Sequence, residues 1–114
     1  MNIEKEQKLV CQKYEAPFVY AEPNLKVGVS KNIQGHAGPI NGIRHIVEKG
    51  TSGWYIWAGE YSTEPDFFVP IHVEHLLELC PIAIKYLSLA PGWRFQITDI
   101  YEDVWEDRSL LIID

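Results

Sequence analysis

Two histidines, His72 and His75, have the spacing in this sequence that most suggests chemistry. They lie at the start of a predicted helix, where side chains three residues apart can lie on one side and share a metal ion. Further ligands could come from His36, His45 or Asp66. The spacing is not the HExxH of a zinc protease, and imidazoles beside an aromatic loop more often pack or form hydrogen bonds. We therefore predict no metal and no other cofactor.

Arrangements for acid–base or nucleophilic catalysis are also weak. Two pairs of carboxylates are available, Glu60 with Asp66 and Glu102 with Asp103. Neither pair has a nearby motif that would stabilise a developing negative charge, and acidic residues in loops are usually solvated. A nucleophilic thiol would need a neighbouring histidine, but Cys11 and Cys80 occupy apolar positions of predicted helices, where a thiol stays protonated. We predict that the protein is not an enzyme and that both cysteines are buried free thiols.

Residues 99–107 form the densest acidic segment of the chain, with five carboxylates, no base, and an interleaved tyrosine and tryptophan. Acidic residues often form only a solvated surface, but a mixture of acidic and aromatic side chains is also the composition of a recognition patch for a basic protein. The loop that follows residue 59 adds two acidic candidates. The predicted partner-binding residues are Tyr101, Glu102, Asp103, Trp105, Glu106, Asp107, Glu60 and Asp66.

The composition narrows the class of partner and the location of the protein. The formal net charge of −6 disfavours a nucleic-acid surface, which needs a basic patch, and it disfavours attraction to anionic lipid. No apolar run approaches the roughly 20 residues that span a bilayer, and the N-terminal segment MNIEKEQK is charged where a secretory signal would be apolar. We expect a cytoplasmic protein with a single domain, residues 1–114, and a basic partner.

Residues 53–79 organise the elements that must position these side chains. The run from Trp54 to Trp57 is aromatic and β-branched, which predicts a central strand. Residues 60–70 carry turn and breaker residues around Phe67 and Phe68, which predicts a loop that docks these two rings against the fold. After Pro70 a helix is expected across the sheet, with a kink or a new start at Pro81 and an end near residue 89. Its apolar face would consist of Val73, Leu76, Leu77, Cys80, Ile84 and Leu87.

The remaining segments complete a predicted α+β fold. A first helix, capped by Asn2, runs to about Tyr14. Strands are expected at residues 18–20, 25–30, 93–98 and 110–113. Residues 31–53 contain five glycines and are expected to form a structured loop, in which Asn41-Gly42 could make a tight hairpin turn. The fold class is α+β: a mainly antiparallel sheet of about five strands covered by an N-terminal helix and a central kinked or split helix.

The four tryptophans fall into two groups. Trp54 and Trp93 lie in predicted half-buried strands and are expected in the core. Trp57 points opposite to Trp54, and Trp105 lies between carboxylates, so these two are expected to be half exposed, as anchors for a partner would be. We also expect Leu76 and Trp93 to be buried against each other's elements, because the strand that carries Trp93 needs a helix as its cover.

Five longer motifs between residues 25 and 111 are rich in glycine and aromatic residues. They are Lys26-Val27-Gly28; Asn41-Gly42-Ile43-Arg44; Gly53-Trp54-Tyr55-Ile56-Trp57 with Gly59-Glu60; Pro65-Asp66-Phe67-Phe68 through His72-Val73-Glu74-His75-Leu76; and Pro91-Gly92-Trp93-Arg94-Phe95 with Tyr101-Glu102-Asp103-Val104-Trp105. In these motifs the chain resembles the bacterial immunity protein thirty-three family, formerly a domain of unknown function.

The resemblance implies that the protein neutralises a partner toxin in a polymorphic toxin system, and it implies no catalytic residues. Two other classes stay open on the residues alone. A small-ligand-binding protein would use a pocket near Arg44, His72 and His75, and a metal-dependent hydrolase would need a metal in the same region. We expect the first class, a non-catalytic inhibitor that binds a basic toxin directly.

Overall fold

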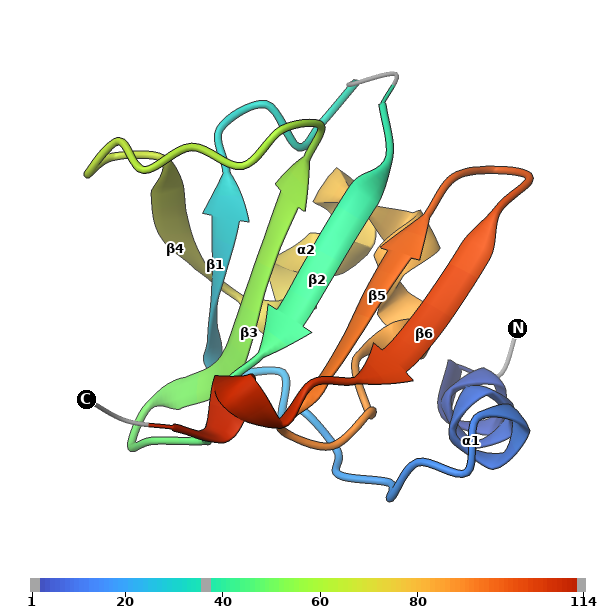
Figure 1. Cartoon of the computed structure of the whole chain (residues 1–114). Helices are drawn as coiled ribbons and strands as arrows, with labels where there is room; N and C mark the ends of the chain where they lie inside the picture. Colours follow the sequence, from blue (N-terminus) through green and yellow to red (C-terminus); the bar gives the residue numbers. More distant parts are fainter. Residues whose placement is uncertain (1–2, 36–37, 113–114) are drawn as a thin grey trace.

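The computed structural model describes residues 3–35 and 38–112, which form a six-stranded sheet with both described α-helices and one of the two described 3₁₀ helices on the same face (Figure 1). The elements in chain order are α1 (Ile3–Lys13), β1 (Lys26–Ser30), β2 (Ile40–Arg44), β3 (Thr51–Ala58), β4 (Phe68–His72), α2 (Val73–Leu79), the 3₁₀ helix η1 (Pro81–Tyr86), β5 (Trp93–Ile97), β6 (Glu102–Glu106) and the 3₁₀ helix η2 (Arg108–Leu111). The strand order is β4-β1-β3-β2-β5-β6. Only the pair β1 and β3 is parallel among the paired strands of the described chain. The predicted α+β class is confirmed, with six strands instead of about five.

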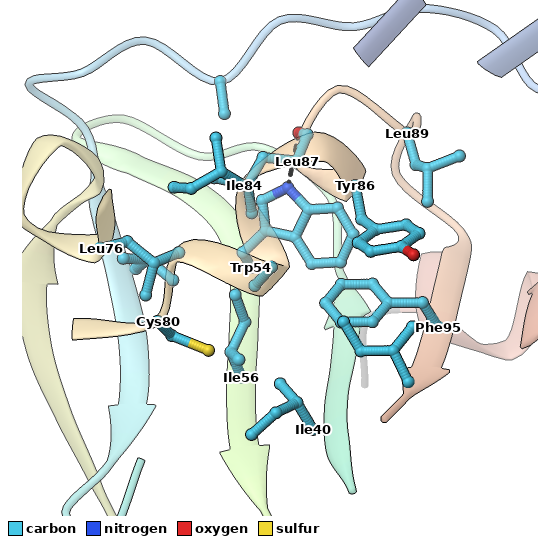
Figure 2. Close-up of a cluster of buried hydrophobic side chains, with 14 of the residues drawn as sticks. Ile40, Trp54, Ile56, Leu76, Cys80, Ile84, Tyr86, Leu87, Leu89 and Phe95 are labelled. Carbon is cyan, nitrogen blue, oxygen red and sulfur yellow. Dashed lines mark hydrogen bonds between the residues drawn. The ribbon is translucent and has the colours of Figure 1, made fainter. Parts of the chain in front are cut away.

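Strand β3 lies inside the sheet, as its aromatic and β-branched sequence predicts. Alternation along the strand points Trp54, Ile56 and Ala58 into the core, where all three are buried. The Trp54 indole Nε1 donates a hydrogen bond to the Leu87 carbonyl at 2.8 Å, so the ring is both packed and satisfied (Figure 2). The opposite residues of β3, Tyr55 and Trp57, point away from the core.

The cover over the core is the predicted helix split at Pro81. α2 ends at Leu79, and η1 begins at Pro81, where a proline in the first turn costs no hydrogen bond. Leu76 is 0% exposed, as predicted, but Leu77 is 49% exposed and does not belong to the apolar face. Trp93 is only partly buried, at the margin of the core. Among the described residues, no helix has the length and apolar character to cross a membrane.

The prediction of a hairpin turn at Asn41-Gly42 is wrong. Both residues lie within β2, which pairs with β3 on one side and with β5 on the other. Gly42 faces the core, where the ring of Phe95 fills the space that a side chain would take, and a Cβ there would be 2.3 Å from Phe95 Cε2. Asn41 points the other way and accepts a hydrogen bond from Gln96 at 2.9 Å. The glycine permits close packing inside a sheet, not a reversal of the chain.

Three further boundaries differ from the prediction. Residues 18–20 form only a single bridge, between Phe18 and Leu89, instead of a strand. The loop after β3 ends earlier than predicted, because β4 includes Pro70; β4 is an edge strand, where a residue without an N–H is tolerated. The predicted closing strand is the 3₁₀ helix η2, which Asp107 caps through a hydrogen bond from the Ser109 N–H. Asn2, the predicted first cap, and residues 113–114 lie outside the described residues.

Candidate functional site: the open face of the sheet

The face of the sheet opposite α1, α2 and η1, here called the open face, is not covered by these three helices, and the short η2 lies against one end of it (Figure 1). Cross-strand pairing aligns one residue from each of the six strands into a row across this face. From β4 to β6 the row is Pro70, Gly28, Tyr55, Ile43, Arg94 and Trp105. Tyr55 is 39% exposed and Trp105 is 36% exposed, so the row offers large aromatic surfaces to solvent. Exposed aromatic residues of this kind are typical anchors of protein interfaces.

The β4 side of the open face is an aromatic cluster built by the loop between β3 and β4. This loop folds back so that Tyr61 lies 5.3 Å from Trp57, Phe67 lies 4.9 Å from Phe68, and Phe68 lies 5.2 Å from Tyr55, all measured between ring centroids. Trp57 is therefore only 6% exposed, although it points away from the core, and the prediction that it is half exposed is wrong. The docked Phe67 and Phe68 rings confirm the predicted docking of this segment, with Phe68 as the first residue of β4.

The β6 side of the open face combines an aromatic ring with charged groups. The Arg94 guanidinium lies over the Trp105 ring, 5.1 Å from its centroid, and donates a hydrogen bond to Asp107 at 3.0 Å. The Ser109 hydroxyl and Arg94 lower the pKa of Asp107, because both donate to the ionised carboxylate. The predicted half exposure of Trp105 is confirmed. Arg94 was not among the residues predicted for the site.

Strand alternation separates the predicted acidic residues into two groups. Asp103, Trp105 and Asp107 belong to the open face, and the Tyr101 hydroxyl donates to Asp103 at 3.3 Å. Glu102 and Glu106 have the opposite parity and lie on the helix side of β6. The acidic segment therefore does not form one surface patch, because every second side chain points to the helix side of the sheet.

Glu102 connects the sheet to the helical side of the fold through hydrogen bonds. Its carboxylate accepts hydrogen bonds from Lys13 at 2.7 Å, from the Tyr86 hydroxyl at 2.5 Å and from the Tyr14 hydroxyl. Partial burial acts to raise the pKa of Glu102, but these hydrogen bonds outweigh it and hold the pKa at about 2. Glu102 is thus occupied within the fold, while Glu106 is exposed and lies 3.6 Å from Arg108. Neither carboxylate is directed toward the open face.

The other two predicted acidic residues lie in the loop at the β4 side. Glu60 is exposed. Asp66 is exposed and accepts a hydrogen bond from Lys31 at 2.8 Å, which lowers the pKa of Asp66. These residues are next to members of the aromatic cluster in the sequence, and strands β2 and β5 lie between β3, where the loop begins, and β6, which carries Asp103.

The predicted alternative pocket is not assembled, because Arg44 is buried on the core side of β2. Its guanidinium donates to four backbone carbonyls, those of Ser52, Val19, Leu87 and Leu89. Burial lowers the pKa of Arg44 to about 10. Strands β1 and β3 separate Arg44 from β4, where His72 lies. This arginine joins β2 and β3 to the segments around residues 19 and 88, which is a structural role.

His72 and His75 are exposed at the start of α2, with ring centroids 6.0 Å apart. Together with Glu74 they are the one group among the described residues whose ligand atoms are close enough, within 4.8 Å of one another, to share a metal ion. The positive end of the α2 dipole lies at the same place, which disfavours a cation. The predicted absence of a metal stays a prediction.

The open face itself could be anticipated only in part. The alternation in β3 and β5 placed Tyr55, Trp57 and Arg94 opposite the core residues, but it could not show which face the helices cover. Ile43 was missed because β2 was not recognised as a strand. The folding back of Tyr61 onto Trp57 depends on the loop conformation, for which the sequence carries no periodic signal.

Comparison with known protein families matches residues 6–107 to the Imm33-like domain. No curated protein and no solved structure shows a significant match to the chain. The matched segment begins within α1, contains all six strands and ends just after β6, so it includes the whole open face. The match confirms the resemblance that the five motifs indicated. On this similarity over most of its length, the chain belongs to the Imm33-like domain family.

Proposed function

We propose that the protein is a non-catalytic, cytoplasmic immunity protein that neutralises a toxin by direct binding through the open face. The family name connects the chain with immunity proteins of toxin systems, and a toxin is the partner that such a protein requires. The observation that carries the assignment to the open face is the row of residues across it, in which the aromatic side chains of Trp105 and Tyr55 are exposed. Sheet surface that the described residues leave exposed is available to a partner.

The open face alone is smaller than a standard protein interface, so we expect the contact to include the loops around the face. Strands spaced about 4.8 Å apart and roughly 17 Å long give a six-stranded face a projected area of about 400 Å². A standard interface buries about 800 Å² on each partner. The loop that carries Glu60 and Asp66, and the segment around η2, would therefore have to contribute, which keeps these two predicted residues in the proposed contact.

The charge of the face favours a basic toxin. The chain has a net charge of −6, which attracts a basic partner at long range. On the open face, Asp107 is paired with Arg94, whereas no ion pair neutralises Asp103 within the described part of the chain. Asp103 is therefore the carboxylate of β6 that we assign to the toxin contact, with Trp105 beside it as the apolar anchor.

The test is substitution of the anchor. Trp105→Ala should weaken binding to the toxin encoded by the neighbouring reading frame and should reduce the survival of cells that express this toxin, because the largest exposed side chain of the face is lost. Leu77→Ala is the matched control, since Leu77 is an exposed apolar residue on α2, on the other side of the molecule. Equal affinity and equal protection for the two variants, with both folded by circular dichroism, would exclude the open face.

A metal-dependent hydrolase is the second candidate, and the proximity of His72, Glu74 and His75 is the observation in its favour. Two features count against it. All three side chains are exposed, so the group has no enclosed substrate site around it, and the helix dipole opposes a cation there. We therefore retain the binding protein as the proposed function.

A further inference from the structure

A hollow of about 410 Å³ opens on the open face between β3, β2 and the turn around η2. Aromatic rings and aliphatic side chains form most of its wall, and one carboxylate stands at its edge. The residues that matter for its chemistry are Ile43, Glu48, Tyr55, Tyr61, Phe68 and Leu110. A volume of this size is at the lower end of ligand sites and holds a single large side chain.

The hollow is held in shape by contacts between distant segments. His45 Nδ1 lies 3.1 Å from the Leu110 carbonyl oxygen, which fixes η2 against the end of β2. Gly53 has a φ of +84°, and a Cβ there would be 2.3 Å from the His45 carbonyl oxygen, so only glycine allows β3 to approach this closely. The Thr51 N–H donates to the Glu48 carbonyl at 3.1 Å and closes the turn that carries Glu48. The site is therefore formed before any partner arrives.

The charge at the hollow is negative. Glu48 is exposed, and no ion pair neutralises its carboxylate within the described residues. None of the described residues that line the hollow is a lysine or an arginine. An anionic occupant is disfavoured by Glu48, and a purely apolar occupant would leave this carboxylate without a partner.

We propose that this hollow is the subsite for one arginine side chain of the toxin. The inference rests on the proposed function, because it names the group that the open face recognises. The methylene stem of an arginine would lie along Ile43 and Leu110, and its guanidinium would lie among the aromatic rings, which attract cations. The guanidinium would also donate to the Glu48 carboxylate in the two-bond geometry that suits a planar fork.

The test uses the protein without its toxin. Nα-acetyl-argininamide is titrated into isotopically labelled protein, and the backbone amide signals are followed by NMR. Saturable shifts are expected at His45, Thr51, Gly53 and Tyr55. Nα-acetyl-citrullinamide, which has the same shape without the charge, should bind about tenfold more weakly. Glu48→Gln should reduce the affinity for the arginine probe to that for the citrulline probe, whereas Glu78→Gln, an exposed carboxamide substitution on α2, should leave it unchanged.

Three results would overturn the arginine subsite: equal affinity for the two probes, shifts confined to residues away from the hollow, or no saturable shift with either probe. A second variant, Tyr55→Leu, removes a wall of the hollow and should weaken the arginine probe even if Glu48→Gln proves unstable. The proposed function fails separately, in the toxin assay. Suppose that the protein binds the arginine probe and that the Trp105→Ala variant protects cells as well as the unmodified protein. The arginine subsite would then be supported, and the proposed toxin interface would be contradicted.

Discussion

The ring of Phe95 lies where Gly42 would carry a side chain, so that a Cβ on residue 42 would be 2.3 Å from Phe95 Cε2 and 2.4 Å from Cζ. The two residues face each other on neighbouring strands, β2 and β5. Phe95 also stacks on Tyr86 of η1, with 4.9 Å between ring centroids, and Tyr86 in turn donates to Glu102. The absence of a side chain at Gly42 therefore leaves room for the Phe95 ring. The stacked rings of Phe95 and Tyr86 connect the sheet to the helices (Figure 2).

Gly42→Ala should lower the free energy of unfolding by about 1 to 3 kcal/mol, because a methyl group would displace a buried ring in a packed core. Gly28→Ala is the comparison. A Cβ there would be 2.8 Å from Tyr55 Cδ1, but Tyr55 is on the open face and can move into solvent, so a smaller loss is expected. Chemical denaturation of both variants measures the difference. An unchanged midpoint for Gly42→Ala would mean that Phe95 does not occupy this space.

A second stability prediction concerns α2, where neighbouring leucines have opposite environments. Leu76→Ala should cost about 2 to 5 kcal/mol, since the side chain is fully buried and its removal leaves a cavity. Leu77→Ala should change stability by less than about 0.5 kcal/mol, because that side chain is already half exposed. Denaturation midpoints decide the matter, and similar losses for the two variants would place the apolar face of α2 elsewhere.

The third prediction is the pH dependence that Glu102 introduces. The pKa of Glu102 is about 2 in the folded chain against an ordinary value of 4.5, so folding favours the ionised carboxylate. This contribution to stability is fully present above pH 4.5 and is lost as the pH falls towards 2. Glu102→Gln should cost about 1 to 3 kcal/mol at neutral pH, since three hydrogen bonds to a charged group are weakened.

The control for Glu102 is Glu106→Gln, on the same strand and the same side of the sheet, where the carboxylate is exposed. This variant should keep the neutral-pH stability and the acid loss of the unmodified protein, while Glu102→Gln should lose less additional stability on acidification. Thermal melting across the acid range gives both quantities. The same geometry means that charge reversal at Glu102 would disturb the fold, so Glu102 cannot serve as a pure test of the toxin interface.

The fourth prediction is that the fold needs no metal. His72, Glu74 and His75 offer three exposed ligands at a helix start, whereas structural zinc sites usually have four. Protein purified without a histidine tag should contain no stoichiometric transition metal, and a chelator should leave its melting temperature unchanged. Substitution of His72 and His75 by alanine together should change stability by less than about 0.5 kcal/mol for each surface site. One bound metal per chain and a large fall in melting temperature on chelation would contradict this prediction.

The elements that the sequence predicted well are those in which local pattern and packing agree. β5 alternates Phe95 and Ile97 with Arg94 and Gln96, and the structure buries the first pair. Pro81 splits the covering helix because a proline cannot continue it. The fold class followed from these elements.

The predictions that were wrong concern residues whose conformation depends on contacts with segments distant in the sequence. Asn41-Gly42 has the local signature of a turn, but the strand on each side and the Phe95 ring decide its conformation. The parallel pairing of β1 with β3 joins strands that are not consecutive in the sequence. In the site, neighbouring carboxylates of β6 point to opposite faces because side chains alternate along a strand. Residues 99–107 were not predicted to contain a strand, so their acidic side chains were interpreted as one surface. Glu102 accepts hydrogen bonds from Lys13 and Tyr86. These two residues belong to elements far from β6 in the sequence, so no local sequence pattern predicts the contacts.

The last prediction tests which carboxylate of β6 meets the toxin. Asp103→Lys should slow association with a basic toxin, weaken the salt dependence of the association rate and reduce protection, because Asp103 lies on the open face beside Trp105 and has no base paired with it among the described residues. The fold should be retained, since the side chain is exposed.

The control for Asp103→Lys is Glu78→Lys on α2, which makes the same change in net charge on the opposite side of the molecule. At physiological salt, where screening limits interactions to about 8 Å, only a charge near the interface should have a large effect, so Glu78→Lys should remain close to the unmodified protein. Stopped-flow association at low and physiological salt separates the two cases. Equal slowing by both variants would show that only net charge matters, and no slowing by Asp103→Lys would remove the β6 side of the open face from the contact and leave the loop with Glu60 and Asp66 as the acidic candidate.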